Sequence, residues 1–266
     1  MPITSQSTRL IRLLLCVVPL LAPAGFAVAA ELGLEEVREH LKSASAANPA
    51  DLAGKDLSDL DLSGLDFRNA RLKGTSFFGS RLVNSDFRGG DLRSANLNGA
   101  WLMGTNFSGA DLSGASLLSV VVLGGEVKAR PIFNGAKMRG VKMIADLPGA
   151  DLAGADLSNS RIGVNIKNQG MGQMRTDLTG ANLAGVNFAG ADVNRSLMTF
   201  ANLKGANLSG ASFFRVKLSG ADLSGADLTG ADFAEAELDG VNLRGAKGID
   251  KAKGLDTAEG LDKALR

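Results

Sequence analysis

The residues best suited to chemistry are four carboxylates near the start of a long repetitive region. Asp56, Asp59, Asp61 and Asp66 form this group. Clustered carboxylates are typical Ca²⁺ ligands, but their spacing here does not follow that of a calcium-binding loop. The chain has a single histidine, His40, so a histidine-based metal site or catalytic triad cannot be assembled. We interpret the cluster as a solvated acidic rim, with a calcium site as the alternative.

Other motifs give no support for catalysis. The sequence has no Gly-x-Ser-x-Gly elbow and no phosphate-binding loop, and Gly170-Met-Gly172 lacks the third glycine of a dinucleotide fingerprint. Cys16 is the only cysteine, which excludes intrachain disulfides. The sequence therefore predicts no catalytic residue, no cofactor and no metal.

A repeat of five residues, most often Ala-Asp/Asn-Leu-Ser/Thr-Gly, dominates the chain. Its central position is apolar, and the residue two before it is small. Glycine often stands two residues after the centre, which suits turn dihedral angles that other residues rarely adopt. The centres are Leu52, Leu57, Leu62, Phe67, Leu72, Phe77, Leu82, Phe87, Leu92, Leu97, Leu102, Phe107, Leu112, Leu117 and Val122, then Leu147, Leu152, Leu157 and Ile162, then an unbroken run from Leu178 to Leu243.

A period of five matches neither a helix nor a flat strand, so each unit is a short extended piece followed by a turn. Phe67, Phe87 and Phe107 recur at twenty residues, as do Phe213 and Phe233. Four units therefore make one coil. Stacked at about 4.8 Å, such coils form a rod of roughly 45 to 50 Å.

This motif resembles the pentapeptide-repeat family over about three quarters of the chain. The resemblance implies an all-β fold, a right-handed quadrilateral β-helix with Leu or Phe inside and short helical caps. It also implies a possible homodimer. Some family members mimic DNA and inhibit a type II topoisomerase, which is the alternative function here. An export signal and a formal net charge of only +1 disfavour it.

Residues twenty apart should stack in columns on the outside, where unlike charges and amides attract. The column Asp51, Arg71, Asp91 alternates in sign. A second column, Asn182, Asn202, Asp222 and Asn242, predicts an amide ladder. The abundant Asp and Asn residues are thus interpreted as architectural.

The ends differ from the repeat. Residues 1–30 carry Arg9 and Arg12 before an apolar stretch and a small-residue run, which predicts a signal peptide removed near Glu31. Residues 31–49 predict an amphipathic capping helix, residues 50–247 the β-helix, and residues 248–266 a C-terminal cap. We therefore expect an exported protein, periplasmic or secreted.

Two stretches, 124–146 and 163–177, depart from the repeat. The first predicts a basic patch that would attract an anionic partner. Alternatively both stretches are degenerate coils or small loops, since Val127 and Ile132 continue the five-residue spacing. The residues of the patch are Lys128, Arg130, Lys137, Arg139 and Lys142.

One side of the coil, with inward residues Leu62, Leu82, Leu102 and Val122, predicts an exposed apolar stripe. It contains the only tryptophan and an arginine, a combination typical of protein-binding surfaces. Alternatively, an irregular segment folds back over it. The predicted residues are Phe78, Arg81, Val83, Trp101, Met103, Val121 and Leu123.

The sequence therefore favours a non-enzymatic exported scaffold. Its partner would be an unknown protein or a component of the cell envelope, and no nucleic acid is expected. A glycan-processing β-helix enzyme is a weaker alternative, because the chain has one Trp and no Tyr to form sugar-binding platforms.

Overall fold

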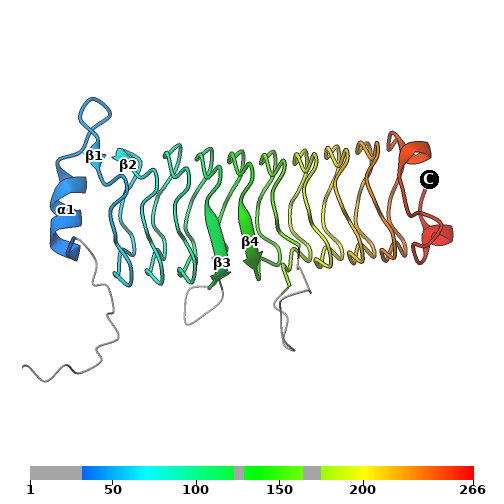
Figure 1. Ribbon diagram of the computed structural model, residues 1–266, viewed down its shortest axis with the longest axis horizontal. Coiled ribbons are helices and arrows are strands. Elements are labelled where there is room, and N and C mark those ends of the chain that lie inside the picture. The colour runs from blue at the N-terminus through cyan, green and yellow to red at the C-terminus, as the bar shows by residue number, and fades with distance from the viewer. Residues whose placement is uncertain (1–31, 123–128, 164–174) are drawn as a thin grey trace, which may run out of the picture.

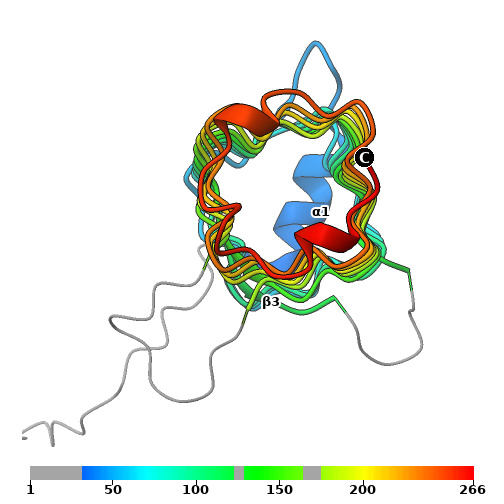
Figure 2. The same ribbon diagram turned by 90° about the vertical axis from the view of Figure 1, so that its right-hand side faces the viewer.

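The computed structural model describes residues 32–122, 129–163 and 175–266. They form a rod of stacked coils, with helix α1 (Leu34–Lys42) at one end and the C-terminal residues at the other (Figure 1). Along the rod axis the coils superimpose on a four-sided outline (Figure 2). The predicted β-helix with helical caps is confirmed.

Four pentads make one coil, as the spacing of the phenylalanines predicts. Parallel bridges join residues twenty apart, for example Asp91 with Asp111 and Asn202 with Asp222. We number the four sides by the inward residue of the first coil: face 1 (Leu52), face 2 (Leu57), face 3 (Leu62) and face 4 (Phe67). All four of these residues are fully buried.

Regular strands are few because each extended piece is short. β1 (Ala50–Asp51) pairs in parallel with β2 (Ala70–Arg71) on face 1, and β3 (Ser116–Val120) pairs with β4 (Lys142–Ala145) on face 2. Elsewhere a single bridge residue precedes each inward residue. The turn then places glycine at positive φ, as at Gly180 (64°) and Gly230 (70°), which confirms the role predicted for these glycines.

The core is a continuous apolar column along the rod axis. The Leu, Phe, Val, Ile and Met centres are 5 % exposed or less. On face 4 the rings of Phe67, Phe87, Phe107 and Phe133 stack with successive centroid separations of 4.6, 5.1 and 5.1 Å. Small hydroxyl side chains fit beside them, and Thr105 donates to the Leu82 carbonyl of the previous coil (2.7 Å).

Both ends of this core are covered. On the N-terminal side, Val37 of α1 is buried and Leu34 and Leu41 pack against the core. On the C-terminal side, the short 3₁₀ helices η2 (Ile249–Lys251) and η3 (Leu261–Lys263) belong to a last coil. Its bridge residues Lys247, Lys253, Glu259 and Leu265 are six apart instead of five, and η2 and η3 lie between them. No helix within the described ranges is long and apolar enough to cross a membrane.

The first irregular stretch is shorter than residues 124–146. Gly104 donates its N–H to the Ala129 carbonyl (2.8 Å), and Ile132 pairs with Asn106. The inward residue is Phe133, and Ile132 lies on the outside, so the register expected from Val127 and Ile132 is wrong. Val127 itself lies outside the described residues. The coil has resumed by Ala129 because inter-coil hydrogen bonds set the register.

The second stretch, predicted to run to residue 177, ends before that residue. Asp177 already forms a parallel bridge with Asp146 in the previous coil. The bridges that span the two stretches join residues 26 and 31 apart, instead of twenty. The first stretch leaves the coil after Val122 on face 3, and the second leaves after face 2 and returns to face 3 at Asp177. Face 3 is therefore the face that both stretches border.

Candidate interaction surface

Most outward Asp and Asn side chains serve the architecture. Asn202 donates its side-chain amide to Asn182 (3.2 Å), and Asn242 donates to Asp222 (3.0 Å). Asp222 also accepts the backbone N–H of Ser224 (2.9 Å), which fixes the turn that follows. The predicted amide ladder is confirmed for these two pairs.

The acidic residues at the start of the repeat do not converge. Asp56 lies on face 2, Asp61 on face 3 and Asp66 on face 4. The hydrogen bond from Ser63 lowers the pKa of Asp61, and the hydrogen bond from Arg68 lowers that of Asp66. Asp56, Asp61 and Asp66 are thus each satisfied by a local partner, that of Asp56 being Ser58. Over the residues that the structure covers, no group of three or more His, Cys, Asp or Glu is arranged to hold a metal ion.

The predicted apolar stripe is present in part. The Arg81 guanidinium carbon lies 4.9 Å from the centroid of the Trp101 ring, a cation–π contact on face 3. Val121 follows in the next coil, and Phe78, around the corner on face 2, is 50 % exposed. We call Phe78, Arg81, Trp101 and Val121 the tryptophan surface.

Val83 and Met103 are not part of this surface, because they are only 6 % and 2 % exposed. They occupy one column with Ala129, since the Asn84 N–H donates to the Met103 carbonyl and the Gly104 N–H donates to the Ala129 carbonyl. Both side chains are therefore buried, and the prediction that they are exposed is wrong. Leu123 lies outside the described residues.

The predicted basic patch does not form. Lys137 and Arg139 lie on face 1 and Lys142 on face 2, while Arg130 is at the corner between faces 3 and 4, beside Gly149. Arg139 is also neutralised by an ion pair with Asp156. Residues close in sequence are distributed around the coil because the chain turns every five residues. Lys128 lies outside the described residues.

In the middle of face 3, two carboxylates stack on successive coils. Asp146 pairs through its backbone with Asp177. Burial and the neighbouring Asp177 charge raise the pKa of Asp146, while Arg130 acts in the opposite direction. This like-charge contact separates the tryptophan surface from a second surface further along the rod.

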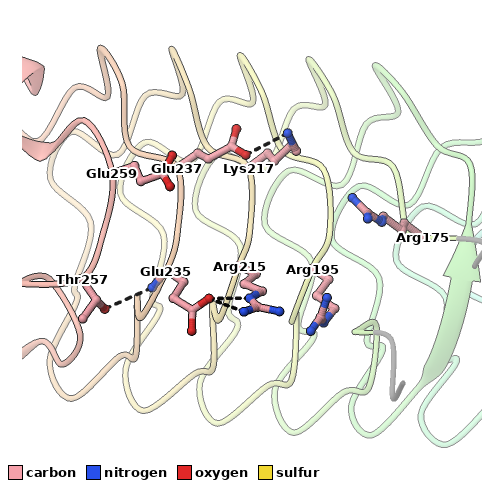
Figure 3. A pocket seen from close by; sticks show the side chains of 8 residues that line it. All are labelled: Arg175, Arg195, Arg215, Lys217, Glu235, Glu237, Thr257 and Glu259. Carbon is pink, nitrogen blue, oxygen red and sulfur yellow. Dashed lines mark hydrogen bonds and ion pairs between the residues drawn. The ribbon is translucent and has the colours of Figure 1, made fainter. Parts of the chain in front are cut away.

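The second surface is a charged groove that the sequence analysis missed. Its volume is about 380 Å³, and it follows the corner between faces 2 and 3 in the C-terminal half (Figure 3). A sequence signal for it exists: Arg195, Arg215 and Glu235 replace the glycine of the repeat at successive coils. We call the lining residues the charged groove: Arg175, Arg195, Arg215, Lys217, Glu235, Glu237, Thr257 and Glu259.

Comparison with known families agrees with this geometry. The model of the pentapeptide repeats matches residues 50–79, 80–117, 176–213 and 211–247, in eight copies. The chain belongs to the pentapeptide-repeat family. Its fold is therefore the right-handed quadrilateral β-helix of that family. The pentapeptide match omits residues 118–175, the region that contains both irregular stretches.

Among solved pentapeptide-repeat structures, similar ones include HetL, involved in heterocyst differentiation regulation in the cyanobacterium Nostoc sp. strain PCC 7120. HetL is 27 % identical, with a TM-score of 0.43 over 88 % of this chain and 94 % of HetL. Full-length QnrB1, a plasmid-mediated fluoroquinolone resistance protein, is 21 % identical, with a TM-score of 0.32 over 72 % and 92 %. A protein of the Arabidopsis thaliana thylakoid lumen is 26 % identical, with a TM-score of 0.23 over 41 % and 66 %. No curated protein sequence matches this pentapeptide-repeat chain significantly.

Proposed function

We propose that this pentapeptide-repeat protein is a non-enzymatic exported scaffold that binds a partner protein through the tryptophan surface. The observation that carries the proposal is the contact of Arg81 with Trp101 on face 3, next to Phe78, which is half exposed. Tryptophan and arginine are enriched among residues that dominate binding energy. Faces 1 and 4 present mainly laddered polar side chains in this half of the rod, so face 3 has a distinct chemical character.

The backbone beneath the tryptophan surface supports the proposal because it is rigidly held. Arg81 and Trp101 form a parallel bridge, and Leu82 donates its N–H to the Trp101 carbonyl (2.9 Å). A partner would therefore meet side chains whose backbone is already ordered, which lowers the entropic cost of binding. Export is proposed from the signal-like composition of residues 1–30, which lie outside the described residues.

A topoisomerase-inhibiting DNA mimic is not favoured by the described surface. A duplex mimic requires a continuous series of negative charges. On face 4, Arg68 pairs with Asp66 (2.6 Å) and Arg88 pairs with Asp86 (2.6 Å). These pairs break the acidic series in both coils.

The test is a pulldown from an envelope extract of the source organism with the wild-type protein and the Trp101→Ala variant. Trp101 is an outward residue, so we expect unchanged circular dichroism and loss of the captured partner. Arg71→Gln on face 1, which also removes an exposed outward side chain, is the matched control and should capture the partner normally. Equal capture by the wild type and Trp101→Ala would refute the tryptophan surface, and collapse of the fold would place Trp101 in the core.

Export requires a separate measurement. The N-terminal sequence of the protein, purified from envelope and cytoplasmic fractions, should begin near Glu31 in the envelope or secreted fraction. An intact N-terminus confined to the cytoplasm would refute export and leave the binding proposal to be judged by the pulldown alone.

A further inference from the structure

The charged groove is built from two parallel columns of side chains. Arg175, Arg195, Arg215, Glu235 and Thr257 each lie two residues before a bridge residue of face 3, in five successive coils. Arg195, Arg215, Glu235 and Thr257 occupy one corner of the rod and form one row in Figure 3, while Arg175 lies apart from that row. This corner column changes from cationic to anionic between Arg215 and Glu235.

The bridge residues form the second column, on face 3 itself. From Leu197 onward, this column continues with Lys217, Glu237 and Glu259. It changes sign at the same place as the corner column, between Lys217 and Glu237. The coincidence of the two changes divides the groove into a cationic part nearer Asp177 and an anionic part nearer the C-terminal cap.

Ion pairs form only where the two parts meet. Arg215 binds Glu235 through Nη2 (2.5 Å) and Nε (2.6 Å), and Lys217 binds Glu237 (2.8 Å). The structure, within its described ranges, gives no ion pair to Arg175, Arg195 or Glu259. The groove thus has two arginines available at one end and a carboxylate available at the other.

The backbone of the corner column is strained in a way that the fold does not require. Arg195, Arg215 and Glu235 have φ values of 61°, 56° and 56°. Most corners of the rod use glycine at this position because a Cβ atom disfavours positive φ. Three successive coils therefore keep a charged side chain at a corner where glycine would be unstrained.

The ring of Phe214 positions the two guanidiniums beside it. The Arg195 guanidinium carbon lies 5.7 Å from the ring centroid, and the Arg215 carbon lies 5.0 Å from it. A guanidinium held over a ring keeps its N–H groups free to bind a carboxylate. Arg215 already binds Glu235 in this way, which leaves Arg195 oriented for an external group.

We propose that the charged groove binds an extended peptide segment of a partner protein, with acidic residues over Arg175 and Arg195 and a basic residue over Glu259. This inference rests on the proposed function, since it supposes a protein partner. Five coils at about 4.8 Å span about 19 Å, which is the length of about six extended residues. A small anion would satisfy only the cationic end, whereas a segment with blocks of opposite charge matches both ends.

The test measures binding of two labelled synthetic peptides of identical composition to the full chain by fluorescence anisotropy. In the block peptide, glutamates occupy one end and lysines the other; in the control peptide they alternate. We expect the block peptide to bind more tightly and its affinity to fall with added salt. Arg195→Gly and Glu259→Gln should each weaken its binding up to about fivefold.

Arg195→Gly separates binding from folding, because glycine adopts the required φ without strain and should not lower the thermal midpoint. Arg244→Gln on face 4 removes an equal charge far from the groove and should leave binding unchanged. Equal affinities for the two peptides, or an equal loss in Arg244→Gln, would overturn the proposal. Saturation of the arginines by inorganic phosphate with no peptide binding would also overturn it, in favour of a small-anion site.

Failure of this inference differs from failure of the proposed function. A partner captured through Trp101 in the absence of peptide binding would overturn the groove alone. Peptide binding that depends on Arg195, with no dependence of partner capture on Trp101, would support the groove and refute the tryptophan surface.

Discussion

Replacement of Phe107 by alanine tests how strongly the aromatic column of face 4 stabilises the rod. The ring is fully buried and stacks between Phe87 and Phe133, with centroids 5.1 Å away on each side. Truncation would therefore remove a complete side chain from the middle of the column and both of its aromatic contacts.

The expected cost follows from these contacts. Phe→Ala in a close-packed core costs about 3 to 5 kcal/mol through lost burial and the cavity left behind. Each aromatic pair contributes about 0.5 to 1.5 kcal/mol beyond burial. Phe107 has two such pairs, so we place its cost near 5 kcal/mol. Phe188→Ala is the matched comparison, because Phe188 has one edge contact, at 6.3 Å with Phe213, and should cost nearer 3 kcal/mol.

The assay is equilibrium unfolding in guanidinium chloride, followed by circular dichroism, with Phe107→Leu as a further control. Leucine fills most inward positions of the repeat but cannot form either ring contact, so Phe107→Leu should cost about 1 to 3 kcal/mol, less than Phe107→Ala. The double-mutant cycle of Phe87 and Phe107 should give a coupling energy of about 0.5 to 1.5 kcal/mol. A cost for Phe107→Ala below that of Phe188→Ala, or a coupling near zero, would refute the stabilising role of the stack.

Two further predictions concern turns and charges. Gly254→Ala should destabilise the protein more than Gly225→Ala. Both substitutions strain the backbone, because both glycines have positive φ. A Cβ at Gly254 would also lie 2.5 Å from Cα of Ala234, whereas a Cβ at Gly225 would meet no atom within 4 Å. Equal thermal midpoints of the two variants would contradict this. The hydrogen bond from Arg88 lowers the pKa of Asp86. The ionised carboxylate therefore stabilises the fold at pH values above its ordinary pKa of about 3.9. This stabilisation is lost as the pH falls through the lowered pKa. Arg88→Gln should raise the pKa of Asp86 in an NMR titration; an unchanged pKa would show that Arg88 is not the cause.

The sequence predicted the inward residues well because the physical signal for them is unambiguous. A centre such as Leu62 or Phe107 must be apolar on every coil, and its partners twenty residues away must be compatible with it. The turn glycines and the amide ladder followed from the same periodicity. These features depend on neighbours at a fixed spacing, which a sequence displays directly.

Exposure on the outside was harder to predict because it depends on more than the alternation of the backbone. Val83 follows an inward residue, where the backbone alternation predicts an outward side chain, yet it is only 6 % exposed. The basic patch failed for a different reason: Lys137 and Lys142 are only five residues apart, and a step of five moves a side chain to the next face. Proximity in sequence is therefore a poor guide to a surface patch in this fold.

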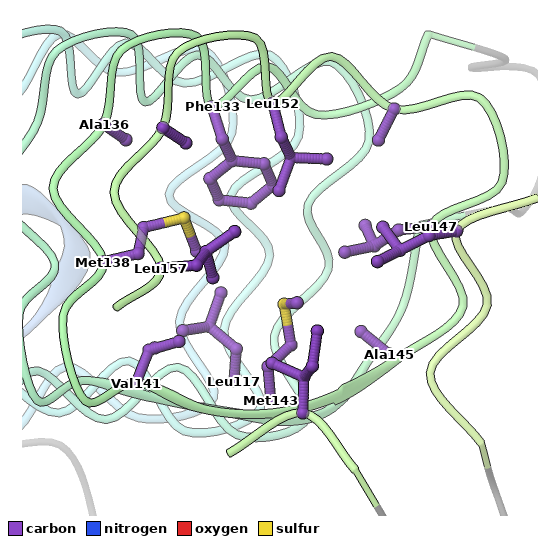
Figure 4. Packing of buried hydrophobic residues seen from close by; sticks show 14 of the residues in the cluster. Leu117, Phe133, Ala136, Met138, Val141, Met143, Ala145, Leu147, Leu152 and Leu157 are labelled. Carbon is purple, nitrogen blue, oxygen red and sulfur yellow. The ribbon is translucent and has the colours of Figure 1, made fainter. Parts of the chain in front are cut away.

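The register after the first irregular stretch shows what holds the coils together. Figure 4 shows Phe133, Met138 and Met143 directed into the core although none continues the spacing from Val122. The bridges across this region join residues 26 apart and then 19 apart, neither of which is a multiple of five. The coil tolerates both because each new turn aligns its N–H and carbonyl groups on the turn before it. The same tolerance explains why chain can be added beside face 3 without loss of the scaffold. A rod of this kind can therefore vary one face while the buried column remains unchanged, and both candidate surfaces lie on or beside that face.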